Sequence, residues 1–162
     1  MPDEMNFIRP RDVDAFGFDW GRLALTVGPE VNGAKQFSGG VVDLPSGQGH
    51  TRHNHPGAEE IIFVISGEGE QMVEDPDGKP VTVKVGPGTT VFVPESRFHS
   101  TLNTGPGPMF VGRAGVAEIG LRRQMSRLAP CFAVARLTES DEVLIRNHET
   151  LRTTGKTLAA NA

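Results

Sequence analysis

The chain has 162 residues, with 16 basic and 20 acidic side chains and a net charge of −4. This length suffices for one domain with a core, and the scattered basic residues argue against nucleic-acid binding or a membrane-surface role. The single cysteine excludes an intrachain disulfide, and there is no signal-peptide pattern or long apolar run, so we expect a cytoplasmic protein.

Turn-forming residues are frequent, with 20 glycines and 12 prolines separating short runs of Val, Ile, Thr and Phe. After an irregular segment over residues 1–19, the pattern predicts strands over 20–27, 37–44, 50–55, 60–66, 70–74, 81–85, 89–93, 99–103 and 109–116. Strands at this spacing are typical of an all-β sandwich or closed barrel. Helical spacing over 118–128 and a capping-box sequence from Thr138 then predict short C-terminal helices.

The predicted strand over 60–66 is apolar on both faces apart from Glu60. One face should line the core, with Glu60, Ile62 and Val64 on the same side. The other face, with Ile61 and Phe63, should be covered by terminal segments or by a second subunit. On this basis we predict a homodimer.

A set of nitrogen and carboxylate donors has spacings that can build one metal site; it consists of His53, His55, Glu60 and His99. His53 and His55 are two apart, so in an extended strand they point to the same side. Glu60 follows a Pro-Gly bend, and a return strand could bring its carboxylate beside both imidazoles. Such a set suits one divalent transition metal, Mn, Fe, Ni or Zn, and leaves two positions for water, substrate or dioxygen. The remaining positive charge favours an anionic or chelating small molecule.

These residues belong to two longer motifs, which read Gly47, His53, His55, Glu60, Gly67 and then Gly88, Pro94, Ser96, His99, Asn103. Both resemble the motifs of the cupin family, except that Ser96 stands where the family has glycine. We therefore expect the turn at Ser96 to be of a different type, because serine tolerates positive φ less well. The resemblance covers residues 37–116 and implies a double-stranded β-helix, a jelly-roll barrel. It also implies metal ligation by the three histidines and Glu60.

The domain organisation that follows has three parts. Residues 1–36 form an N-terminal segment and strand packing on the barrel, 37–116 the cupin barrel core, and 117–162 a C-terminal helical extension and tail. Glu59 is the alternative ligand to Glu60, but only Glu60 keeps the six-residue spacing to Gly67. His50 has the opposite strand parity from His53 and is expected in a loop or facing outward.

Several polar residues are candidates for substrate contact: Arg97, Gln71, Arg113, Thr51 and Thr101. Arg97 is preferred because it shares strand parity with His99 and could pair with a carboxylate or phosphate. No residue can be assigned as the general acid or base.

The resemblance does not decide the reaction, because one fold hosts many chemistries. The favoured hypothesis is a metalloenzyme with non-redox chemistry on an oxygen-rich metabolite, of the sugar or sugar-phosphate isomerase, lyase or decarboxylase type. The alternatives are an Fe- or Mn-dependent dioxygenase, a non-catalytic ligand-binding or sensor module, and a structural protein with a metal-stabilised barrel.

Overall fold

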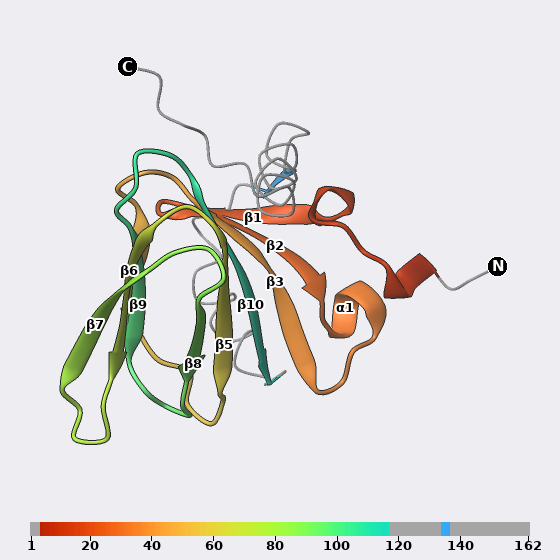
Figure 1. The fold of residues 1–162 in the computed structure, drawn as a ribbon. Coiled ribbons are helices and arrows are strands. Elements are labelled where there is room, and N and C mark those ends of the chain that lie inside the picture. Colours follow the sequence, from red (N-terminus) through yellow and green to blue (C-terminus); the bar gives the residue numbers. More distant parts are fainter. Residues whose placement is uncertain (1–3, 117–133, 137–162) are drawn as a thin grey trace, which may run out of the picture.

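The structure is a computed structural model that describes residues 4–116 and 134–136. Two antiparallel sheets face each other across a common core (Figure 1). The larger sheet has the order β11-β1-β2-β3-β10-β5-β8 and the smaller sheet the order β4-β9-β6-β7. The strands are β1 (Asp14–Phe18), β2 (Gly21–Val27), β3 (Phe37–Leu44), β4 (Gly49–His53), β5 (Glu60–Ser66), β6 (Gly69–Glu74), β7 (Pro80–Val85), β8 (Thr90–Val93), β9 (His99–Asn103), β10 (Met109–Val116) and β11 (Val134–Arg136). This is the expected all-β, double-stranded β-helix architecture.

Short helical turns lie only near the N-terminal part of the described chain: η1 (Glu4–Asn6), η2 (Pro10–Asp12) and α1 (Pro29–Asn32). No described helix is long and apolar enough to span a bilayer. The two predicted C-terminal helices lie outside the described residues.

The core lies between the two sheets and comes from alternating positions of their strands. Its buried members are Leu23, Val42, Leu44, Ile62, Val64, Val85, Val93, Met109 and Val111. On β5 the side chains of Glu60, Ile62 and Val64 are all buried, whereas Ile61 and Phe63 are 50% and 45% exposed. The two-residue period of the strand therefore places a carboxylate inside the barrel, in line with core residues. The outer face of β5 is not covered within the described structure, so the homodimer stays a prediction.

The expectation that residues 1–19 are irregular is wrong for their second half. β1 pairs with β2 along Ala15 to Phe18, and with β11 along Asp14 to Phe16. Ala15 and Ala24 pack against each other with no exposed surface. Small residues fill this contact, so the segment lacks the run of large apolar side chains by which a buried strand is recognised.

The three glycines that begin or end the motifs have left-handed backbone conformations, with φ of 76° at Gly47, 82° at Gly67 and 89° at Gly88. At Gly67 a Cβ atom would lie 2.7 Å from the Cα of Met109. Only glycine satisfies both requirements, so this turn sets the close approach of β5 to β10.

Asn103 joins the ends of three segments from a fully buried position. Its Nδ2 donates to the carbonyl oxygens of Leu44 and Gly107, both at 2.8 Å, and its Oδ1 accepts from the amide of Gly105 at 2.9 Å. The last residue of the second motif therefore has a structural role, holding the loop before β10 against the end of β3.

Candidate metal centre

A β-bulge in β4 determines which histidines face the barrel interior. His50 pairs with Thr101 of β9, and His53 pairs with His99, so three steps on β4 match two steps on β9. The extra residue lets His50 and His53 share a face, because residues paired directly across an antiparallel ladder point to the same side. The expectation that His50 faces outward is wrong for this reason.

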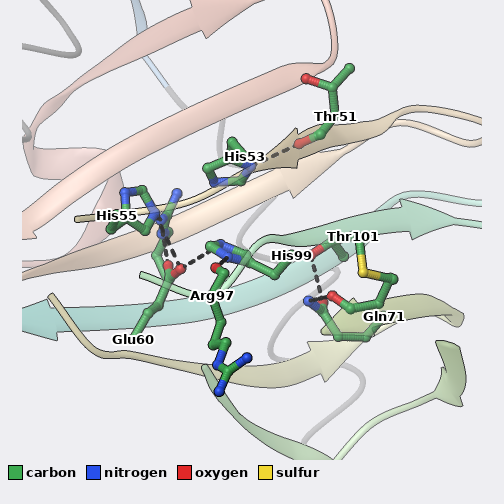
Figure 2. Close-up of polar contacts among 10 residues, drawn as sticks. Thr51, His53, His55, Glu60, Gln71, Arg97, His99 and Thr101 are labelled. Atoms are coloured by element: carbon green, nitrogen blue, oxygen red, sulfur yellow. Dashed lines mark hydrogen bonds and ion pairs between the residues drawn. The ribbon is translucent and has the colours of Figure 1, made fainter. Parts of the chain in front are cut away.

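Three imidazoles converge at one end of the barrel (Figure 2). One ring nitrogen from each of His53, His55 and His99 lies within 4.8 Å of the other two. The Nδ1 of His53 contacts the carbonyl oxygen of Thr51 at 2.7 Å, and the Nδ1 of His99 contacts that of Arg97 at 3.1 Å. A carbonyl on Nδ1 holds the proton there and leaves Nε2 with a free lone pair, which is the state a metal ligand needs.

The carboxylate of Glu60 lies close to two of these rings. Its Oε2 lies 3.0 Å from Nε2 of His99 and 3.4 Å from Nε2 of His55. Ligands about 2.1 Å from a metal and at right angles to one another lie about 3 Å apart, so these separations fit neighbouring positions of one ion. Oε2 of Glu60 and Nε2 of His99 are also buried without a hydrogen-bond partner among the described residues. The donor set therefore fits a divalent transition metal.

The carboxylate of Glu60 is ionised because a cation lies beside it. Its Oε1 forms an ion pair with Nη2 of Arg113 on β10, and the side chains are 4% and 15% exposed. Burial alone would raise the pKa of Glu60, but the charge of Arg113 and the nearby His55 and His99 rings hold this pKa well below its ordinary value. Because Oε1 pairs with Arg113, only Oε2 of Glu60 is available to coordinate a metal ion.

Burial also keeps the nearby histidines neutral. It lowers the pKa of His53 to about 4, and the neighbouring His99 ring also disfavours a positive charge on His53. Burial and the charge of Arg113 lower the pKa of His50 to about 2. At neutral pH both rings carry free lone pairs, which favours ion binding without prior loss of a proton.

The turn at Ser96 keeps the left-handed conformation despite the absence of glycine, with φ of 61°, so the expectation of another turn type is wrong. Its amide donates to the carbonyl of His55 at 3.2 Å, and its hydroxyl accepts from the amide of Gly57 at 3.3 Å. Its carbonyl accepts from Nδ2 of Asn54 at 3.1 Å. These contacts offset the cost of positive φ and tie the loop after His55 to the loop before His99.

The candidate substrate contacts occupy different places. Thr101 and Gln71 are both 4% exposed and hydrogen-bond to each other, from Oγ1 to Oε1 at 2.6 Å. Thr51 is exposed and its side chain points away from the imidazoles (Figure 2). The guanidinium of Arg97 also points away from them and donates to the carbonyl of Asp75. Arg113 is the arginine that lies beside the imidazoles.

A small pocket that is partly open to solvent lies beside this cluster. Apolar and polar side chains both line it: Val42, Leu44, Ile62, Val111, His50, Glu60, His99, Thr101 and Arg113. His50 lines the pocket, although the alternation of side chains along a regular strand predicts that it faces outward. Its ring packs edge-on against Trp20 with centroids 3.6 Å apart and lies 5.1 Å from the ring of His53. Only a signal for the bulge could have placed it correctly.

Known proteins are similar to this chain in sequence and in fold. Residues 40–111 match the family model of the cupin domain. The glucose-6-phosphate isomerase of Thermococcus kodakarensis is 39% identical over 56 residues, which are 35% of this chain and 30% of that protein. The dimethylsulfoniopropionate lyase DddQ of Ruegeria pomeroyi is 43% identical over 61 residues, 38% of this chain and 28% of the lyase. The matched segments thus span about a third of either relative.

A solved structure described as a predicted oxalate decarboxylase from Thermotoga maritima superposes with a TM-score of 0.58 at 21% identity. The match covers 68% of this chain and 98% of that one. At this identity the likeness concerns the fold. Fold, motifs and family match agree for this part of the chain: residues 40–111 match the cupin domain, and the barrel has the fold of the cupin structures to which it is similar.

Proposed function

We propose that this protein is a metal-dependent enzyme that acts on a small anionic, oxygen-rich metabolite by non-redox chemistry. The observation that carries the proposal is the set of possible ligand atoms. One ring nitrogen from each of three histidines lies within 4.8 Å of the other two, and Oε2 of Glu60 and Nε2 of His99 are buried without a hydrogen-bond partner in the part of the chain that the structure describes. A buried polar atom without a partner costs free energy. A metal ion bound by the lone pairs of these two atoms is the simplest explanation for them.

The residues that would hold the ion are His53, His55, His99 and Glu60 through Oε2. A bound divalent ion supplies Lewis acidity, which polarises a carbonyl or carboxylate oxygen of the substrate. Nitrogen-rich sites accept Mn, Fe, Ni or Zn, and affinity alone favours the later members of this series.

The pocket supports an anionic substrate with a compact apolar portion. Arg113 provides a permanent positive charge, and Thr101 and His50 provide hydrogen-bonding groups. Val42 and Ile62 belong to an apolar wall that would contact the carbon skeleton. A sugar phosphate and a small carboxylate both satisfy this description, and the partial relatives act on one or the other by name.

A non-catalytic binding module is the second candidate, and one observation favours it. The carboxylate that could otherwise serve as a base, Glu60, is held by Arg113 and faces the imidazoles. Proton transfer would then fall to His50, whose ring contacts Trp20 at the side of the pocket. His50→Gln separates the candidates, because it should abolish turnover of an enzyme while sparing much of the ligand affinity of a binding module.

The test is a turnover screen of tag-free protein loaded anaerobically with Mn(II), Fe(II), Ni(II) or Zn(II). Substrates are glucose 6-phosphate, dimethylsulfoniopropionate and oxalate, followed by a wider set of small carboxylates and sugar phosphates. We expect metal-dependent conversion without oxygen in the wild type and none in His99→Ala, detected by NMR. Ligand-dependent oxygen uptake would instead select a dioxygenase, and tight binding without conversion would select the binding module. A cytoplasmic location and a homodimer remain predictions, the latter tested by light scattering.

A further inference from the structure

Arg113 contributes a permanent cation to the interior of the barrel. It projects from β10, lines the pocket, and has a side chain that is only 15% exposed. Its partner Glu60 is 4% exposed, so the two form a buried ion pair. In such a pair each charge depends on the other, since neither has water to replace it.

The same guanidinium nitrogen has a second acceptor in the metal cluster. Nη2 of Arg113 lies 3.2 Å from Nε2 of His55. A guanidinium can only donate, so His55 must accept through its Nε2 lone pair. Nε2 is also the atom of His55 that faces the carboxylate of Glu60, at 3.4 Å. A metal ion needs that same lone pair, so the Arg113 contact with His55 and metal ligation by His55 exclude each other.

We propose that Arg113 acts as an internal cation that neutralises Glu60 in the metal-free site, releases His55 when an ion binds, and then receives the anionic ligand. This inference rests on the metal site of the proposed function. It assigns Arg113 a positioning role toward the ion and a binding role toward the anion.

Coupling between the two ligands follows from their charges. A divalent ion beside Arg113 adds positive charge next to a guanidinium whose side chain is only 15% exposed, where repulsion is screened less than at the surface. An anion on the released guanidinium relieves this repulsion. Each ligand should therefore tighten the binding of the other by the same factor, as thermodynamic linkage requires.

The experiment measures Ni(II) affinity by calorimetry and by quenching of Trp20, the only tryptophan in a chain without tyrosine. Arg113→Gln removes the charge but keeps donors for Glu60, and we expect it to bind Ni(II) at least about ten-fold more tightly than the wild type. Acetate replacing chloride at constant ionic strength should tighten Ni(II) binding about five-fold in the wild type, within the usual range of coupling. In Arg113→Gln the acetate effect should disappear.

The matched control is Arg52→Gln, which also breaks an arginine–glutamate pair, with Glu74, but on an exposed side chain. Its Ni(II) affinity should equal that of the wild type. Arg113→Lys keeps a buried charge, so its affinity should stay within about three-fold of the wild type. This variant keeps the test valid if Arg113→Gln does not fold.

Three results would overturn the inference: weaker or unchanged Ni(II) binding in Arg113→Gln, a ten-fold gain in Arg113→Lys, or an equal acetate effect with and without the arginine. The last would mean that acetate binds only the ion. Failure of the wild type itself to bind Ni(II) would instead remove the metal site on which the proposed function depends.

Discussion

Replacing Arg113 with methionine should destabilise the metal-free protein by about 3 to 4 kcal/mol. The change leaves Glu60, 4% exposed, without its cation. Loss of one partner from a buried pair costs roughly 3–5 kcal/mol, because the other charge stays buried and unpaired. Glu60 can instead become neutral by binding a proton. Protonating a carboxylate of ordinary pKa at pH 7 costs at most about 1.36 × (7 − 4.3), or about 3.7 kcal/mol. This limit sets the upper end of the expected loss.

Urea denaturation at pH 7 in the presence of a chelator, followed by Trp20 emission, measures the effect. The double variant Glu60→Gln/Arg113→Met removes both charges and should recover at least about half of the lost stability, because no unpaired ion remains. If the single variant loses less than about 1 kcal/mol, or the double variant is no more stable than the single, the buried pair does not have the energetic role described here.

Three other changes probe the fold and the site. Asn103→Ala removes three hydrogen bonds, two buried and one partly buried, and should cost about 2–4 kcal/mol in urea denaturation; a loss below about 1 kcal/mol would argue against the joining role of this side chain. Because burial lowers the pKa of His53 from 6.5 to about 4, the folded state resists protonation; the metal-free protein should lose about 1–2 kcal/mol as the pH falls from 7 to 5, and His53→Gln should lack this part of the dependence. Glu60→Gln should weaken metal binding at least about ten-fold in calorimetry, whereas the exposed Glu59→Gln should not, and equal effects would contradict the choice of ligand.

The strands follow from local patterns in the sequence, namely the alternation of apolar and polar residues and the turn residues between them, whereas the imidazole cluster is expected from the spacing of the two motifs and their resemblance to cupin motifs. β3, β5, β9 and β10 have the predicted bounds. The convergence of His53, His55 and His99 also agrees with the prediction from the two motifs.

Features that depend on pairing between distant segments could not be derived in the same way. The bulge that turns His50 inward is visible only in the register of β4 against β9. The pairing of Arg113 with Glu60 requires β10 to lie beside β5, and neither spacing nor composition shows this neighbour relation. Strand parity favours Arg97 over Arg113, yet the guanidinium of Arg97 reaches the carbonyl of Asp75 instead. Ser96 keeps a left-handed turn because contacts from the loop after His55 support it.

The bulge in β4 is a place where the strand can change in length without displacing the residues on its inner face. His53 and His55 follow the extra residue, whereas His50 precedes it. A one-residue deletion at Thr51 or Arg52 would restore regular pairing, with His50 still opposite Thr101 and His53 still opposite His99, so both rings would keep facing inward. Related barrels could therefore gain or lose one codon here with the ion-binding residues and the histidine that lines the pocket unchanged.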